Sequence, residues 1–474
     1  MSWCQLKTSK TVPKGTVPFG TVLTNFFGLS SCFTKNSTKR NRPLWYCFAL
    51  LVAVSANAQE QTLRVNYTFS GNSKESHIYL DDLNVIDGWY GRRVNLKDLY
   101  LDGNGQIIMT SAATGDTLYR NAFSTLFQEW QNTEEATQVD KSFENVYLLP
   151  MPTEKAVVQV TLTDNFNKVV ATLRHTVDPE DILIRKIGQN PPKWKYLHQG
   201  GTPEECIDVV IVPEGYTTHE MDLFYKDADI AVTSLFSHEP FKTMQERFNI
   251  LAVELASQDS AVSVPKEGLW TETALSSQFS TFYSDRYLTT LRLRQLHDKL
   301  AGIPYEHIII LANTDVYGGG GIFNSYTLTT AHHSQFAPVV VHEFGHSFGG
   351  LADEYYYDDQ YEQYYNSETE PWEPNITTRV DFDSKWKDMI PADVEQPTPV
   401  PVDDPRSKMD KKQSKAVAKL PPVGLYEGGG YMSKGVWRGS FDCRMHTNTY
   451  PEFCPVCRRS LERIIRFYTE QLDK

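Results

Sequence analysis

Apolar and polar positions alternate along the first third of the chain in a pattern that predicts β-strands. Thr62–Phe69 and Val157–Leu162 alternate in this way, and Val169–Val177 follows a turn rich in Asn. Such alternation is typical of strands with one buried and one solvated face. Gly, Asn and Asp dipeptides separate the runs, as they do in hairpins. We therefore expect an all-β domain of the sandwich type over residues 59–185.

The pattern changes after residues 186–205, a Pro- and Gly-containing segment that we interpret as a linker. Ile207–Pro213 is a nearly continuous apolar run, which indicates a strand covered on both faces. Glu220–Phe236 then has helical periodicity. Strands that alternate with helices are typical of an α/β domain, which we expect over residues 206–474. Further elements are predicted as strands at Phe248–Leu255 and His307–Ala312 and as a helix at Thr289–Leu300.

The strongest chemical signal is the HExxH pattern formed by His342, Glu343 and His346. Two His residues four positions apart lie on one face of a helix, close enough to bind one zinc ion. The Glu between them is placed to take a proton from a metal-activated water molecule. The pattern therefore predicts a catalytic zinc site.

A third ligand is expected shortly after this helix. Gly349 and Gly350 would end the helix and let the chain turn back toward the metal. Asp353 follows and offers a carboxylate, with Glu354 as the alternative ligand. Three protein ligands with one open position are the usual composition of a catalytic zinc site.

Three segments together resemble the IgA-peptidase family of zinc metallopeptidases. They are the run HEFGHSFGGLADEYY, the segment Ile207–Tyr216, and Cys443–Met445 with the later Phe453–Cys457. The resemblance covers roughly residues 200–470, and the preceding β-region resembles the N-terminal domain of that family. It does not carry over immunoglobulin A as the substrate, because pocket shape decides substrate choice.

The resemblance implies a metzincin-like zinc endopeptidase domain. Its ligands would be His342, His346 and Asp353, with Glu343 as the general base. The chain departs from the metzincin spacing, because Ala352 stands where metzincins carry their third ligand and Asp353 comes one residue later.

Met445 is the candidate Met-turn, a Met packed beneath the zinc ligands; the alternative is an ordinary core Met. Tyr431 and Tyr450 are candidate donors to the oxyanion that forms on the scissile carbonyl. His446 is a further polar group near this turn, with a surface position as the alternative.

The cysteines allow two interpretations. Cys454 and Cys457 have the CxxC spacing of half a structural zinc site, but no second CxxC completes it. A disulfide between two of Cys443, Cys454 and Cys457 is permitted in an exported chain, and free thiols are the alternative.

Gly318–Gly321 precedes the segment that leads to the HExxH helix. Glycines permit close backbone approach, so this segment is a candidate sheet edge on which an extended peptide substrate pairs. A flexible loop is the alternative.

Residues 1–58 are predicted to be a signal peptide with an upstream extension. They carry seven Lys or Arg residues and no Asp or Glu. A basic segment at 39–42 precedes the apolar stretch Leu44–Val54 and the small-residue cleavage site Ala56–Ala58. The apolar stretch is too short for a membrane span, so the mature chain is expected to begin at Gln59 without one. We expect a periplasmic, cell-surface or secreted protein.

The formal net charge of −13 argues against a nucleic-acid partner. Together, these features predict an exported zinc-dependent endopeptidase that acts on a protein or peptide. Two other hypotheses stay open: a glycan- or protein-binding protein with a vestigial zinc site, and a zinc amidase that acts on cell-wall peptides. The substrate, the cleavage preference and the oligomeric state do not follow from the sequence.

Overall fold

The N-terminal strands form two four-stranded sheets, with the orders β5-β1-β2-β8 and β4-β3-β6-β7. The computed structural model describes residues 60–357 and 364–471, and the predicted signal peptide lies outside them. The strands are β1 (Gln61–Gly71), β2 (Ser76–Asp87), β3 (Gly105–Ser111), β4 (Thr117–Phe123), β5 (Lys141–Pro150), β6 (Ala156–Thr163), β7 (Val169–Val177) and β8 (Arg185–Lys186).

One core joins the two sheets. Alternate residues of β1, from Leu63 to Phe69, are fully buried, and alternate residues of β6 are buried in the same core. The rings of Phe69 on β1 and Phe123 on β4 lie 6.2 Å apart, so side chains of the two sheets interdigitate. The region is not purely β, because α2 (Leu126–Trp130) follows β4. Thr125 caps this short helix by accepting a hydrogen bond from the main-chain N–H of Gln128. The alternation of apolar and polar residues, which predicts strands, does not indicate this cap.

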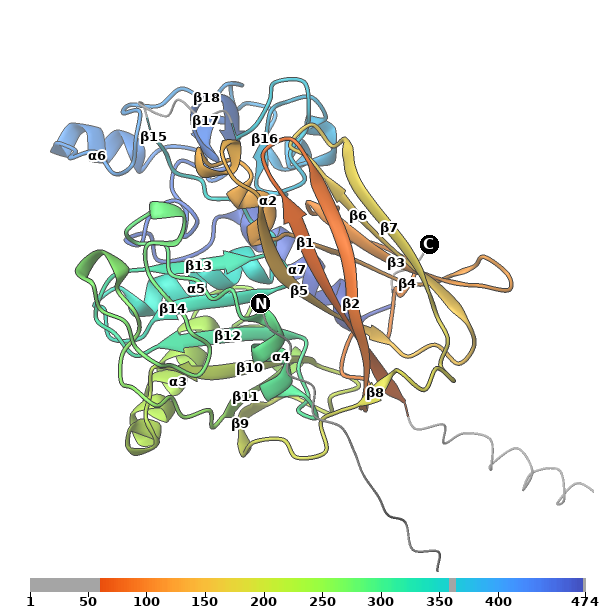
Figure 1. Cartoon of the computed structure of the whole chain (residues 1–474). Helices are drawn as coiled ribbons and strands as arrows, with labels where there is room; N and C mark the ends of the chain where they lie inside the picture. The colour runs from red at the N-terminus through yellow and green to blue at the C-terminus, as the bar shows by residue number, and fades with distance from the viewer. Residues whose placement is uncertain (1–59, 358–363, 472–474) are drawn as a thin grey trace, which may run out of the picture. The chain divides into compact units, whose positions relative to one another are not determined.

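The second region is built on a six-stranded mixed sheet with the order β13-β14-β12-β10-β11-β9 (Figure 1). The four inner strands run parallel, and the two outer strands pair antiparallel to their neighbours. The segment predicted to be a linker supplies the outer strand β9, which pairs with β11 through Trp194 and Tyr196 among others. The strands are β9 (Trp194–Gln199), β10 (Ile207–Glu214), β11 (Phe248–Val253), β12 (His307–Ala312), β13 (Gly319–Ile322) and β14 (Tyr326–Thr330).

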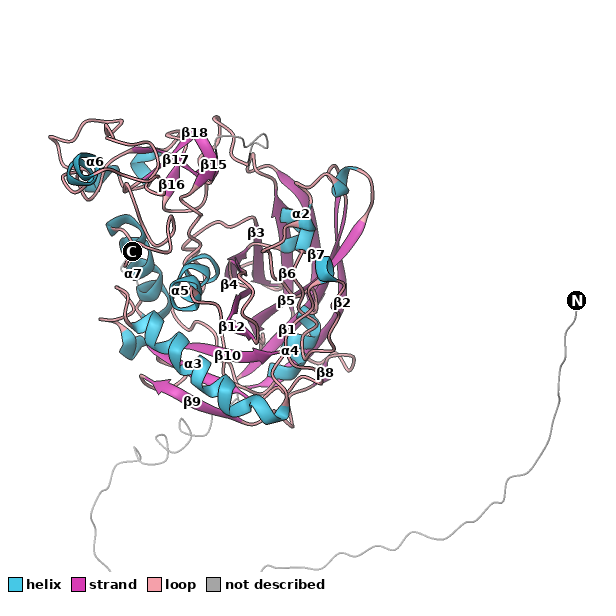
Figure 2. Ribbon diagram, turned by 90° about the vertical axis from the view of Figure 1, so that its left-hand side faces the viewer, coloured by secondary structure: helices cyan, strands magenta, loops and turns pink. Residues whose placement is uncertain are grey.

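Central strand β10 is buried at every position because it faces two cores. Val210 and Val212 pack with α4 and the N-terminal sheets. Val209 and Ile211 pack in a second core with α3, α5 and α7, which Figure 2 shows on that side of the sheet. The helices are α3 (Met221–Phe236), α4 (Leu293–Leu300), α5 (Phe336–Ser347) and α7 (Pro455–Thr469). The apolar runs in the sequence therefore predict β10, β11 and β12, whereas they do not identify β14, and α4 begins four residues later than expected.

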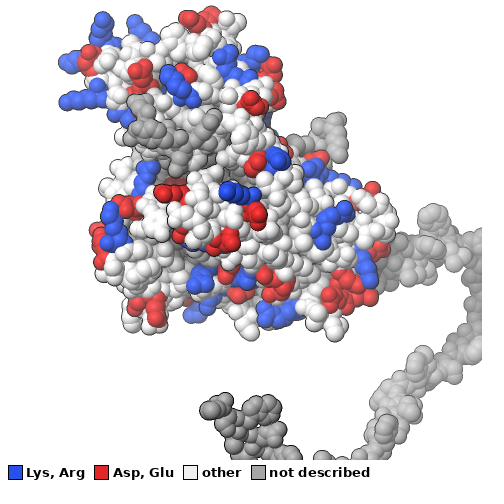
Figure 3. Space-filling view, turned by 45° about the horizontal axis from the view of Figure 1, so that its top comes forward, with Lys and Arg blue, Asp and Glu red and all other residues white. Residues whose placement is uncertain are grey.

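A small sheet and a basic helix form a further layer near the end of α5. Figure 3 shows Lys and Arg side chains gathered over α6 (Lys411–Val417), where they are exposed to solvent. Asp410 caps this helix with both bonds of a capping box. The strands of the small sheet are β15 (Tyr356–Tyr357), β16 (Ile376–Thr377), β17 (Tyr426–Gly429) and β18 (Tyr431–Arg438).

The N-terminal sheets and the mixed-sheet region belong to one compact unit, Ala58–Lys474. The guanidinium of Arg64 on β1 lies 2.6 Å from a carboxylate oxygen of Asp298 on α4. Asn95 donates to the carbonyl of Phe467 at the end of α7. The domain boundaries expected at residues 185 and 205 stay predictions. Among the described residues, no helix is long and apolar enough to cross a membrane.

Helix α4 offers a test of this shared core. Leu296 is fully buried between the β10 face and the N-terminal sheets. We expect Leu296→Ala to lower the free energy of unfolding by about 2–5 kcal/mol, because the lost side chain leaves a cavity. Lys299→Ala, on the exposed face of the same helix, is the control and should stay within about 0.5 kcal/mol. Urea unfolding of both variants measures the difference, and equal midpoints would contradict the packing.

Candidate active site

Helix α5 carries the HExxH motif on the wall of a cleft. Val340 and Phe344 bury the opposite side of the helix in the core that contains α3 and α7. His342 and His346 are one turn apart, and their Nε2 atoms approach to 3.0 Å. The helix therefore presents both imidazoles to one point in space, as the i, i+4 spacing predicts.

The chain turns back after α5 and brings Asp353 to this point. Gly350 has φ +60°, and a Cβ there would lie 2.6 Å from a side-chain carbon of Leu101, so this turn needs glycine. Asp353 Oδ1 then lies 2.9 Å from His342 Nε2 and 3.3 Å from His346 Nε2. Ligand atoms around a tetrahedral zinc ion are about 3.3 Å apart, given zinc–nitrogen and zinc–oxygen bonds of ~2.0–2.1 Å. The three residues thus fit a metal with a fourth, open position.

Carbonyl oxygens orient both imidazoles. His342 Nδ1 donates to the carbonyl of Arg444 at 2.9 Å, and His346 Nδ1 donates to that of Leu351 at 2.6 Å. A ring nitrogen that faces a carbonyl must carry the proton, which leaves the Nε2 lone pair of each ring for a metal.

The second oxygen of Asp353 is held by Tyr431, whose hydroxyl donates to Oδ2. Tyr431 is at the start of β18 with φ +66°, a conformation that L-residues seldom adopt. The structure therefore places this candidate oxyanion donor at the site, in contact with the carboxylate. Tyr450 is partly exposed and is not among the residues that line the cleft.

Met445 lies directly beneath the HExxH helix and is fully buried. A Cβ added to Gly345, between the two His residues in sequence, would meet Met445 Sδ at 2.8 Å. The carbonyl of Met445 accepts from the main-chain N–H of Glu354 at 2.8 Å. Met445 therefore packs against the helix that carries both imidazoles, and its role as a Met-turn stays a prediction. The neighbouring His446 is buried rather than on the surface, and its Nε2 is 3.8 Å from Asp404.

Burial and mutual charge set the protonation of the site. Burial raises the pKa of Glu343 above its ordinary value, although the two imidazoles oppose this shift. For Asp353, burial acts upward, but the His346 and His342 rings outweigh it and hold its pKa well below the usual range. Burial lowers the pKa of His346, yet the carboxylates of Asp353 and Glu343 raise it overall to about 9.

Strand β13 passes close to the part of α5 that carries the HExxH motif. A Cβ at Gly319 would lie 2.8 Å from Glu343 Oε1, and one at Gly321 would lie 2.3 Å from the carbonyl oxygen of Glu343. The glycine run is therefore a strand at a close approach, not a flexible loop. It is the edge of the six-stranded sheet, with one bridge from Tyr287 to Gly319 on its outer side.

The three candidate metal ligands, His342, His346 and Asp353, lie at the floor of a cleft with a volume of about 1410 Å³. Residues of the N-terminal region and of the mixed-sheet region both line this cleft. Glu129 of α2 reaches the cleft and accepts a hydrogen bond from Tyr287. Arg286 also lines the cleft, with its guanidinium over the ring of Tyr355. The sequence carries no local signal for these cleft residues, because they lie far from the motif along the chain.

The cysteines do not form the disulfide considered above. The four cysteines in the described part of the chain are free thiols, and the Sγ atoms of Cys443 and Cys457 are 3.7 Å apart. A disulfide bond measures about 2.05 Å. Glu354, the alternative third ligand, points to these thiols and away from the two imidazoles: Cys457 Sγ lies 3.0 Å from Glu354 Oε1.

Comparison with known families agrees with this geometry. A family profile described as IgA Peptidase M64 matches residues 196–465, and one described as Peptidase M64 N-terminus matches residues 55–174. No curated protein matches the chain. The matched family is one of peptidases, and the site holds residues placed to bind a metal. The chain belongs to the IgA peptidase M64 family.

The charge arrangement predicts how metal binding depends on pH. A proton occupies His346 in the metal-free site below its pKa of about 9, and a metal must displace that proton. We expect the affinity for zinc to rise about tenfold per pH unit from pH 7 to about pH 9. Competition with a chromophoric chelator measures this slope.

Asp353→Asn is the matched variant for this test, because it removes the charge that raises the pKa of His346. In this variant, the zinc affinity should stop rising with pH at a pH nearer to about 6.5, which is the ordinary pKa of His. A wild-type affinity that stays constant from pH 7 to pH 9 would contradict the assignment.

Proposed function

We propose that the protein is an exported zinc-dependent endopeptidase. The observation that carries the proposal is the convergence of His342, His346 and Asp353 within 3.3 Å at the floor of the cleft, with Glu343 alongside. Two imidazoles and one carboxylate suit zinc, and the open fourth position suits catalysis. A zinc ion bound there would polarise the scissile carbonyl and acidify water.

Glu343 is the group that handles protons in this proposal. Its carboxylate accepts a proton from the attacking water and returns it to the leaving amine. A base that performs both steps works best when its pKa is above that of an ordinary carboxylate, and burial acts in this direction on Glu343. The intact base argues for hydrolysis over a binding protein with a vestigial zinc site.

The shape of the cleft supports a polypeptide substrate. The cleft is open, is lined by both regions of the chain, and has glycine strand β13 as one wall. An extended peptide can pair its main chain with the outer side of this edge strand beyond the bridge at Gly319. Glu343 lies against Gly319 and Gly321, so a peptide paired there would pass beside the base.

Tyr431 has two roles in this proposal. In the structure its hydroxyl donates to Asp353 Oδ2, and in the proposed reaction the same single proton would turn to the oxyanion.

The cationic, apolar and small-residue order of residues 39–58 supports export.

Replacing the base separates catalysis from metal binding. We expect Glu343→Gln to keep its zinc and to lose kcat by roughly 10²–10⁴-fold, because an amide cannot accept the proton. The kcat is measured by casein digestion with and without chelator. The zinc content is measured by metal analysis of the same sample. Glu134→Gln is the control, since Glu134 lines the same cleft but is exposed. Near-wild-type turnover in zinc-loaded Glu343→Gln protein would refute the assignment.

The export proposal predicts a mature chain that begins at Gln59. Signal peptidases cleave after small residues, and Ala56 and Ala58 occupy the required positions. N-terminal sequencing of protein recovered from outside the cytoplasm determines this. Retention of Leu44–Val54 in that protein would disprove cleavage.

A further inference from the structure

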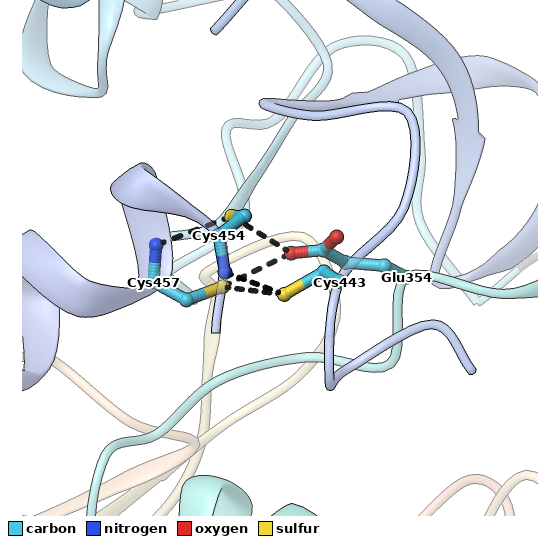
Figure 4. Close-up of side chains that lie close together, drawn as sticks. All are labelled: Glu354, Cys443, Cys454 and Cys457. Carbon is cyan, nitrogen blue, oxygen red and sulfur yellow. Dashed lines mark hydrogen bonds between the residues drawn. The ribbon is translucent and has the colours of Figure 1, made fainter. Parts of the chain in front are cut away.

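A second group of metal-binding side chains is buried behind the active site. It consists of Glu354, Cys443, Cys454 and Cys457, each buried, with donor atoms that all lie within 4.8 Å of one another (Figure 4). They come from three segments: the loop after α5, the turn before Met445, and the start of α7. None of the four lines the cleft.

The distances within this thiol–carboxylate cluster match tetrahedral coordination. Cys443 Sγ and Cys457 Sγ are 3.7 Å apart, and Glu354 Oε1 is 3.0 Å from Cys457 Sγ and 4.0 Å from Cys454 Sγ. Zinc–sulfur bonds of ~2.3 Å place two thiolates of a tetrahedron about 3.8 Å apart. A metal at the centre would therefore need only small shifts of these side chains.

Main-chain N–H groups already point at two of the sulfurs. Cys454 N lies 3.1 Å from Cys443 Sγ, and Cys457 N lies 3.5 Å from Cys454 Sγ (Figure 4). Hydrogen bonds of this kind stabilise thiolates and fix their orientation around a metal. The CxxC pair at the first turn of α7 thus has the local geometry of half a zinc site.

A disulfide accounts for the cluster less well than a metal does. It would join two of the three thiols and leave the third beside a buried carboxylate. Glu354 Oε2 has no hydrogen-bond partner among the described residues, so the protein leaves this buried carboxylate incompletely satisfied. A cation bound by Glu354 would neutralise the charge of the carboxylate.

We propose that Glu354, Cys443, Cys454 and Cys457 bind a structural zinc ion, separate from the ion at the HExxH motif. Three soft thiolates with one hard oxygen favour zinc over magnesium or calcium. Four protein ligands leave no open position, which is the arrangement of structural sites and not of catalytic ones.

This second ion would hold the active site in shape. Glu354 directly follows Asp353, and Cys443 is two residues before Met445. The main-chain N–H of Glu354 donates to the carbonyl of Met445, so the loop and the turn are already joined at one point. Binding both segments to α7 through one metal fixes the position of Asp353 beneath the imidazoles.

The test measures zinc content and zinc–sulfur coordination in the full mature chain. We expect two zinc ions per wild-type chain by elemental analysis, and X-ray absorption should reveal sulfur neighbours for one of them. The double variant His342→Ala, His346→Ala should keep one zinc, with three sulfur neighbours. Cobalt substituted into this variant should show the charge-transfer absorption of a thiolate site.

Substitution in the cluster gives the complementary result. Cys457→Ser should lose the sulfur-bound zinc and melt at a lower temperature. Cys206→Ser is the matched control, since Cys206 is a buried free thiol outside the cluster, and it should keep both ions. If Cys457→Ser does not fold, the double His variant still tests the site.

Two results would overturn the proposal. One is a double His variant without zinc or zinc–sulfur scattering, and the other is a purified chain in which two of the three thiols are joined by a disulfide. A third result separates the two sites. If the wild-type chain holds one zinc ion, bound by sulfur, and the His substitutions leave that ion in place, the thiol–carboxylate site is supported and the catalytic zinc site is refuted. The failure of either assignment is therefore distinguishable from that of the other.

Discussion

The active site depends on a carboxylate that is buried against two imidazoles. Isolating Asp353 from water would be costly without a favourable partner, and the rings of His342 and His346, which hold its pKa low, lie against it. The need to satisfy this buried carboxylate explains several surrounding features. They are the carbonyls that orient the rings, the glycine turn that reverses the chain, and the hydroxyl of Tyr431 on the second carboxylate oxygen. A metal bound by the three residues would supply the compensating positive charge beside Asp353.

The mixed sheet supplies the rigid frame for this arrangement. Its inner strands are buried on both faces, so α5 rests on a layer that cannot readily shift. The edge strand β13 then approaches the main chain of Glu343 so closely that only glycine fits at Gly321. In the proposed function, this edge strand both lies beside Glu343 and leaves main-chain groups with which a peptide substrate could pair. The N-terminal region also lines the cleft, through α2 and through residues outside this helix such as Asn104 and Asp164.

Adjacent residues Asp353 and Glu354 point to two different clusters. Successive side chains of an extended segment lie on opposite sides, so one carboxylate meets the imidazoles while the next meets the thiols. The assignment of Asp353 over Glu354 from spacing agrees with this placement. The CxxC spacing at Cys454 and Cys457 indicated only half of a metal site. The other half, Cys443 and Glu354, comes from residues 11 and 100 positions before Cys454, a separation that no local pattern reveals.

Short-range periodicity let the sequence alone identify the HExxH helix, the buried strands β10, β11 and β12, and the β-character of the N-terminal region. Each of these follows from which residues share a face over one or two turns or a few strand positions. Three features depended on the tertiary structure. They are the strand β9 within the expected linker, the positions of Glu129 and Tyr287 in the cleft, and the contact of Glu354 with three thiols. These contacts join segments that are distant in sequence, and the packing of sheets and helices, not the spacing of residues, brings them together.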